Sequence, residues 1–167
     1  MEKEIVNRVA NSQLKTIDLE DFYPKGNRVT LDIKQWLFHE LILKEKEFRQ
    51  SLIEHDWNQY DNCYISLTCS SDAIIPSWAY LLISTYLTNA KKVVVGNLTD
   101  LEHAIFFELI QNFDITEYEN KPVIIKGCSS KPIPETAYLQ LIERLQPIVK
   151  SIMFGEACST VPLFKKK

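Results

Sequence analysis

The sequence predicts a layered α/β fold with a mostly parallel sheet, and two observations carry this prediction. From residue 63 onward, short apolar runs alternate with amphipathic stretches long enough for helices, which is the pattern of repeated strand–helix units. Several runs are continuously apolar, as in Val93-Val94-Val95 and Val123-Ile124-Ile125, which is expected of parallel strands covered on both faces. No linker rich in serine or glycine divides the chain, so we expect one domain over residues 1–167.

Each element is expected from its own local pattern. The N-terminal 60 residues contain two β-leaning runs, around 5–9 and 28–33, and a helical period over 34–60. We expect this part to add antiparallel strands and covering helices to the sheet. The repeated units that follow supply the remaining elements: strands over 63–68, 92–95, 122–126 and 149–154, and helices over 75–86, 98–111 and 134–145.

Composition and charge narrow the class of protein. Hydrophobic residues make up 46% and charged residues 25% of the chain, which is the balance of an ordinary globular protein and excludes a disordered or collagen-like chain. The net charge of −3 offers no broad basic field, so we expect no nucleic-acid partner. The apolar runs are too short to cross a bilayer and the charged N-terminus lacks a signal-peptide core, so we expect no membrane association and a cytoplasmic location.

The cysteines recur in a repeated setting. In a cytoplasmic protein the four cysteines are expected to be thiols, metal ligands or catalytic groups rather than disulfides. Two segments begin with the same three residues: Cys69-Ser70-Ser71 and Cys128-Ser129-Ser130. When a one-residue gap is allowed, both continue with Ile-Pro and then Ala-Tyr-Leu. A shorter third copy is Cys158-Ser159-Thr160. Each copy follows an expected strand. Because carboxyl ends of parallel strands meet at one edge of a sheet, we expect the three thiols to converge there.

Three converging thiolates require a positive charge between them, which a metal ion supplies. Two identities fit the residue types: an iron–sulfur cluster with three protein thiolates and one open iron, or zinc with three cysteines and a fourth ligand or water. Asp72 is the first candidate for the fourth ligand, with Glu156, His39 and His103 as others. Cys63 lies too far along its strand to join the site.

Other features of the loops support binding at the same edge. Helices are expected to follow Cys69 and Cys128, and a helix N-terminus favours a thiolate. Ser70, Ser129 and Ser159, with the loop N–H groups, are the candidate cofactor-binding residues. Three glycines fall at expected strand ends, where the backbone turns tightly or approaches a ligand: Gly96, Gly127 and Gly155.

Alternative interpretations remain open from the residues alone. The cysteines are also typical of small buried side chains at strand ends, and Asp72 is typical of a helix cap. A metal-free enzyme or sulfur carrier would use one cysteine of low pKa as its nucleophile, whereas a partner-binding scaffold would use the charged segment 34–60. The four glycines supply no dinucleotide or Walker loop, and no G-x-S-x-G occurs. The sequence leaves open whether the chain is an enzyme, and its oligomeric state.

Several segments together resemble a known family. They are the opening 4–12, Leu67-Thr68-Cys69 with 72–76, Ile125-Lys126-Gly127-Cys128, and the ending 151–156 with 158–162. These segments resemble the family called domain of unknown function 2480, and the likeness extends over essentially the whole chain. The resemblance implies a bacterial protein without an assigned activity, and an association with iron–sulfur cluster assembly proteins as partners.

Overall fold

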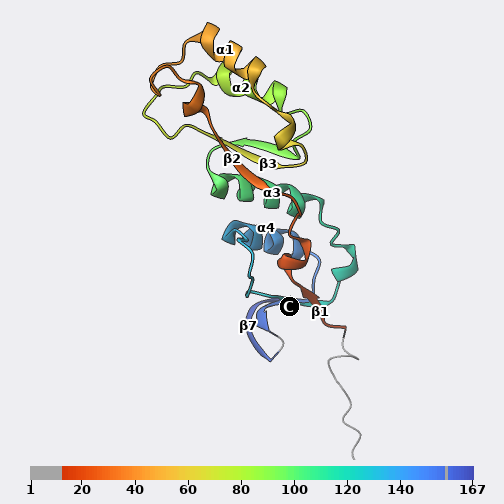
Figure 1. The fold of residues 1–167 in the computed structure, drawn as a ribbon. Coiled ribbons are helices and arrows are strands. Elements are labelled where there is room, and N and C mark those ends of the chain that lie inside the picture. The colour runs from red at the N-terminus through yellow and green to blue at the C-terminus, as the bar shows by residue number, and fades with distance from the viewer. Residues whose placement is uncertain (1–12, 157) are drawn as a thin grey trace, which may run out of the picture. The chain divides into compact units, whose positions relative to one another are not determined.

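The computed structural model describes residues 13–156 and 158–167, and these residues form two compact units (Figure 1). Unit 2 is the continuous segment Pro24–Ile105, whereas unit 1 combines the chain up to Tyr23 with Phe106–Lys167. Unit 2 is therefore inserted into the sequence of unit 1. Each unit has its own sheet and its own hydrophobic core.

Unit 2 contains a three-stranded parallel sheet in the order β2-β3-β4. Figure 1 shows α1 and α2 together on one face of this sheet, and the buried side chains of the two helices form a core with Leu31, Ile65 and Leu67 of the strands. The bounds of these elements are β2 Arg28–Asp32, α1 Glu45–Glu54, β3 Tyr64–Thr68, α2 Ser77–Tyr86 and β4 Lys92–Val95.

Unit 1 contains a four-stranded sheet in the order β1-β5-β6-β7. The first three strands are parallel, and β7 returns antiparallel to β6. Helix α3 begins in unit 2 and ends in unit 1, because the boundary between Ile105 and Phe106 falls within it. The bounds are β1 Lys15–Ile17, α3 Leu98–Asn112, β5 Pro122–Ile125, α4 Glu135–Leu145, β6 Ser151–Glu156 and β7 Ser159–Lys165.

The α/β class and the mostly parallel strands are confirmed, and the elements expected from residue 63 lie within a few residues of the expected bounds, but β7 was not expected from the sequence. The strands are divided between two sheets, however, where one was expected. The antiparallel N-terminal addition is also wrong for the described residues, because β1 and β2 both pair parallel to their neighbours. The β-leaning run around residues 5–9 lies outside the described residues.

The segment 34–60 is only partly helical, which corrects the expectation of a helical period throughout. After a short 3₁₀ helix, Ile33–Trp36, the chain forms a tight hairpin closed by a bridge between Phe38 and Ile42. His39 and Glu40 at its tip have φ values of 48° and 61°, which no helix allows. The α-helix is therefore confined to α1, Glu45–Glu54.

The two units repeat one structural plan. In each unit a first strand pairs parallel with a second, and the second pairs parallel with a third, so that β1-β5-β6 corresponds to β2-β3-β4. Ile17 faces Ile125 in unit 1 as Leu31 faces Leu67 in unit 2. Leu67 of β3 and Ile125 of β5 therefore occupy equivalent positions, and equivalent positions of these two strands are 58 residues apart in the sequence.

The same spacing continues on both sides of these strands. Pro76 and Pro134 are the N-caps of α2 and α4, with φ values of −67° and −64°. Short 3₁₀ helices, Asn58–Tyr60 and Thr116–Tyr118, precede the second strands. The two cores are built from equivalent buried side chains, all 58 residues apart: Phe48 and Phe106, Leu52 and Ile110, Tyr60 and Tyr118, Ala79 and Ala137, Ile83 and Leu141, Leu87 and Leu145.

The third strands end in equivalent glycines. Gly96 follows β4 and Gly155 lies near the end of β6, with φ values of +140° and +123° that side-chain-bearing residues rarely adopt. A Cβ on Gly155 would stand 2.5 Å from the carbonyl oxygen of Ser159, and a Cβ on Gly96 would collide with the Asp100 carboxylate. Beyond Gly155 the chain continues into β7, a strand without a counterpart among the described residues of unit 2.

Candidate functional site

The carboxyl ends of the parallel strands of unit 1 form an edge with two exposed thiols. Cys128 follows β5 by three residues, and Cys158 lies in the turn between β6 and β7. Both cysteines are free and exposed. Because β5 and β6 are neighbouring parallel strands, the two thiols belong to the same edge of one sheet. We call this group, with Asp18 and Lys126, the thiol edge.

The loop that carries Cys128 is held by hydrogen bonds to one carboxylate. The backbone N–H of Ser130 donates to Oε2 of Glu20 at 3.0 Å, and its hydroxyl donates to Oε1 at 2.5 Å. These bonds lower the pKa of the Glu20 carboxyl. Ser129 accepts from the N–H of Lys131 at 3.0 Å, so its hydroxyl is engaged within the loop. The two serines fix the loop and leave the Cys128 thiol exposed.

The charges at the thiol edge compensate one another. Lys126 Nζ lies 3.1 Å from Oδ2 of Asp18, and this bond, with the charge of Glu156, raises the pKa of the lysine. Asp18 also accepts the N–H of Glu20 at 3.0 Å. Burial raises the pKa of the Tyr138 hydroxyl, and the negative charges of Asp18 and Cys128 add to the effect. Lys126 is thus neutralised by carboxylates, and its charge is not committed to a thiolate.

Unit 2 has a related arrangement at the carboxyl ends of β2 and β3. Cys69 is half-buried, with its Sγ 3.3 Å from the hydroxyl oxygen of Ser71. Asp32 accepts the N–H of Ser70 at 3.1 Å and the N–H of Lys34 at 3.0 Å. Burial acts to raise the pKa of the Asp32 carboxyl, but the hydrogen bonds from Ser70 and Lys34 outweigh it and the pKa is lowered. The loop after β3 is therefore held by a carboxylate, as in unit 1.

The strand register corrects the one-residue gap in the alignment of the two loops. Thr68 is equivalent to Lys126, so Cys69 is equivalent to Gly127 and Cys128 is equivalent to Ser70, with no gap before the following prolines. The two cysteines thus occupy neighbouring positions rather than the same position of the repeated plan. What the two units share is the Ile-Pro-x-x-Ala-Tyr-Leu segment that begins α2 and α4.

The premise for convergence of three cysteines is wrong, because β3 lies in one sheet while β5 and β6 lie in the other. Cys69 belongs to unit 2, and Cys128 and Cys158 belong to unit 1. Within residues 13–156 and 158–167, no three His, Cys, Asp or Glu side chains are grouped so that they could hold a metal ion. Assignment of the three cysteines as ligands of one metal stays a prediction.

The helices expected after Cys69 and Cys128 are present, with α2 beginning at Ser77 and α4 at Glu135. The helix cap expected at Asp72 is wrong. Asp72 is exposed and caps no helix, because the N-cap of α2 is Pro76 without a side-chain bond. Ser159 begins β7, where it pairs with Glu156.

Sequence reasoning missed the carboxylates that organise both edges. A repeated signal was present in Thr16-Ile17-Asp18-Leu19 and Thr30-Leu31-Asp32-Ile33, where an aspartate follows a short β-leaning run. Both aspartates cap a short 3₁₀ helix by accepting the N–H two residues later. Cys63 is buried, consistent with its exclusion from the candidate ligands.

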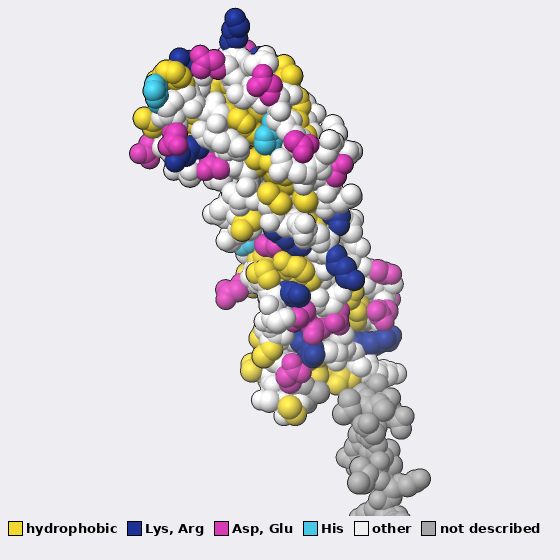
Figure 2. All heavy atoms as spheres, in the orientation of Figure 1, with side chains coloured by type: hydrophobic (Ala, Val, Ile, Leu, Met, Phe, Trp, Pro, Cys, Tyr) yellow, Lys and Arg dark blue, Asp and Glu magenta, His cyan; other side chains and the backbone are white. Residues whose placement is uncertain are grey.

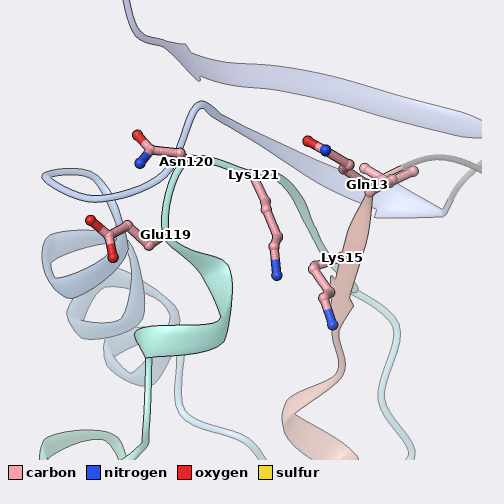
Figure 3. Close-up of a pocket in the computed structure, with 6 residues that line it drawn as sticks. Gln13, Lys15, Glu119, Asn120 and Lys121 are labelled. Carbon is pink, nitrogen blue, oxygen red and sulfur yellow. The ribbon is translucent and has the colours of Figure 1, made fainter.

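A pocket of unit 1 lies away from the thiol edge (Figure 3). Its volume is about 560 Å³, and it is formed where β1 and β5 begin, by residues that include Lys15, Asn120 and Lys121. Lys15 and Lys121 both bind Glu117, the first through the carboxylate at 2.8 Å and the second through the backbone carbonyl at 2.6 Å. Both lysines of this pocket are therefore held by protein groups.

Comparison with known proteins gives one match. The family model described as a protein of unknown function, DUF2480, matches residues 3–166. No curated protein and no solved structure matches the chain. Among the described residues, no helix has the length and apolar character needed to span a bilayer.

Proposed function

We propose that this chain, which belongs to the DUF2480 family, binds a metal centre through the exposed thiols of its unit 1. The observation that carries the proposal is the position of Cys128 and Cys158, both exposed after neighbouring strands of one sheet. Thiolates are ligands of zinc and of iron–sulfur clusters, and either centre fits this donor set.

The surroundings of the thiol edge support this proposal. Lys126, the cation nearest in sequence to Cys128, is bound to Asp18, so a metal ion rather than this lysine would balance two thiolates. Two protein thiols leave coordination positions open, and such a centre can be passed to another molecule. The proposal accordingly includes iron–sulfur assembly proteins as partners in the cytoplasm. Cys69 as a third ligand stays a prediction from the sequence.

A second candidate function is metal-free thiol chemistry at Cys128. The observation that favours it is an exposed thiol on a loop fixed by the two hydrogen bonds between Ser130 and Glu20. A fixed, accessible thiol can act as a nucleophile or carry sulfur, provided that its thiolate is populated. This candidate predicts that Cys128 alone reacts fast, whereas the metal proposal requires both Cys128 and Cys158.

The test is elemental analysis after anaerobic purification. Iron, zinc and sulfide are measured per chain for the wild type and for Cys128→Ser, Cys158→Ser and Cys69→Ser. Cys63→Ala serves as the matched control, because this cysteine is buried. Loss of metal in the Cys128 and Cys158 variants, with the control unchanged, supports the proposal. Retention of metal in Cys69→Ser would remove Cys69 from the ligand set. A chain that stays metal-free after reconstitution would contradict the proposal and favour the second candidate.

A further inference from the structure

Unit 2 exposes a group of aliphatic side chains that lies outside the thiol edge. Ile74 is 93% exposed, and Leu41 and Ile42 are each 56% exposed. Leu41 and Ile42 follow the tip of the hairpin, and Ile74 lies in the loop between β3 and α2. We call these three residues the apolar patch. Single exposed apolar side chains are common on proteins, but a contiguous group marks an interaction site.

A cavity of about 610 Å³ joins the members of the apolar patch. Pro76 and Trp78 line it alongside the three aliphatic residues, and the carboxylates of Glu45 and Asp72 add an acidic contribution. Figure 2 shows hydrophobic side chains reaching the surface of unit 2 among acidic and basic ones. The apolar patch is therefore part of a hollow that can receive a side chain.

The hairpin that presents Leu41 and Ile42 is strained. His39 and Glu40 both have positive φ, although neither is a glycine or an asparagine. Two contacts hold the tip: Glu40 pairs with Lys34 at 2.9 Å, and Lys44 Nζ lies 3.2 Å from the centre of the Phe38 ring. Strained backbone of this kind persists where the surroundings fix it, and it clusters at binding sites.

The charges around the cavity indicate what it binds. Lys34, Lys44 and Arg49 each pair with a glutamate of the same unit: Glu40, Glu47 and Glu45, respectively. Asp72 takes part in none of the ion pairs among the residues that the structure describes. The cavity therefore combines apolar walls with one negative charge that lacks a cation, and its complement is an aliphatic side chain beside a basic one.

We propose that the apolar patch docks a short segment of a partner protein that presents an aliphatic residue next to a lysine or arginine. Nine residues line the cavity, whereas a stable protein–protein interface uses about 20–30 residues on each side. The size favours a peptide segment over a second copy of the chain. This inference goes beyond the proposed metal site, since the apolar patch lies in unit 2 and the thiol edge in unit 1; Asp72 is the one residue of the cavity that the sequence also offered as a metal ligand.

The experiment screens a phage-displayed library of random dodecapeptides against the full chain and measures the best peptide by fluorescence anisotropy. We expect enriched peptides to share an aliphatic residue adjacent to Lys or Arg. Ile74→Ser combined with Leu41→Ser should weaken binding about tenfold or more, because the anchor loses its apolar contacts. Asp72→Asn should weaken it about two- to fivefold and reduce its salt dependence, whereas Asp72→Glu should retain it.

The controls lie on the same unit. Leu81→Ser changes an exposed leucine of α2, and Asp61→Asn changes an exposed aspartate; neither residue lines the cavity. Both should bind the peptide like the wild type, and thermal melts should show every variant folded, since each altered side chain is exposed. Three outcomes would overturn the proposal: no enriched peptide, equal weakening by the controls, or self-association of the wild type that Ile74→Ser abolishes.

Discussion

Asn62 and Asn120 hold the same backbone position in the two units of the chain. Both have left-handed φ values, 59° and 55°, two residues before the second strand of their unit begins. The N–H of Asn62 donates to the carbonyl of Asn89, and the N–H of Asn120 donates to the carbonyl of Ile148, each at 2.9 Å. The acceptors also occupy equivalent places, just before the third strands. The two units thus share a turn as well as a strand order.

Replacement of either asparagine by alanine should destabilise its unit by about 1–2 kcal/mol, because alanine adopts this left-handed conformation poorly. Glycine at the same positions should cost less than alanine, since it adopts positive φ without steric penalty. Urea denaturation of Asn62→Ala, Asn120→Ala and the two glycine variants measures the differences. Equal stability of alanine and glycine variants would contradict the role of backbone conformation.

The four thiols should differ in reactivity according to exposure. Cys128 and Cys158 are exposed, Cys69 is half-buried and Cys63 is buried. We therefore expect a disulfide reagent to label the first two rapidly in the native protein, Cys69 more slowly, and Cys63 only after unfolding. Mass spectrometry of timed samples assigns each modification. Fast labelling of Cys63 in the folded chain would contradict its burial in the core of unit 2.

Asp32 should contribute stability that depends on acid pH. Its pKa is lowered in the folded state, so its contribution is present above the ordinary value of 3.8 and is lost as the pH falls through the folded pKa. Asp32→Asn should lose about 1 kcal/mol at pH 7, because a neutral amide oxygen accepts the N–H bonds of Lys34 and Ser70 more weakly than a carboxylate does. The difference from the wild type should shrink as the pH falls below about 4. Denaturation midpoints from pH 7 to 3 measure it, and a constant difference would exclude the linkage.

Tyr118 should make the folded chain sensitive to alkaline pH. Burial, with the hydrogen bond to Glu117, raises the pKa of its hydroxyl from 10.0 to about 12. The neutral phenol is favoured in the folded state, so its contribution is present below pH 10 and falls between pH 10 and 12 as the unfolded chain ionises. Titration at the tyrosinate absorbance should show a late component that is missing from Tyr118→Phe. A titration unchanged by that substitution would contradict the assignment.

Periodicity predicted the α/β class and the elements from residue 63 to β6 because these patterns are local, whereas it missed β7. Both Val93-Val94-Val95 and Val123-Ile124-Ile125 form parallel strands as expected, but burial on both faces is confirmed only for Val123-Ile124-Ile125, because Val95 is 57% exposed. Sheet membership depends on pairing over long distances, as between Lys15 and Val123, and no local pattern encodes it. The single sheet edge inferred for three cysteines failed for that reason.

The sequence predicted the residues of the candidate site better than it predicted their arrangement in space. The Cys-Ser-Ser signature led to loops at the carboxyl ends of β3 and β5. The duplicated plan of the two units, however, aligns the Ile-Pro-x-x-Ala-Tyr-Leu segments and not the cysteines, because the register shifts Cys128 by one position relative to Cys69. The roles of Glu20 and Asp32 depend on hydrogen bonds to loops 110 and 38 residues away in sequence. Spacing in one sequence does not reveal such bonds.

The insertion of unit 2 into unit 1 imposes an order on synthesis. All three strands of unit 2 lie within Pro24–Ile105, so its sheet can pair before the rest of the chain leaves the ribosome. Strand β1 is the first of the described strands to be made, yet its partner β5 begins only at Pro122. Closing so long a loop carries an entropic cost that a preformed unit 2 reduces, since it replaces most of the flexible chain with a compact body. Strand β1 is consequently made early and pairs late.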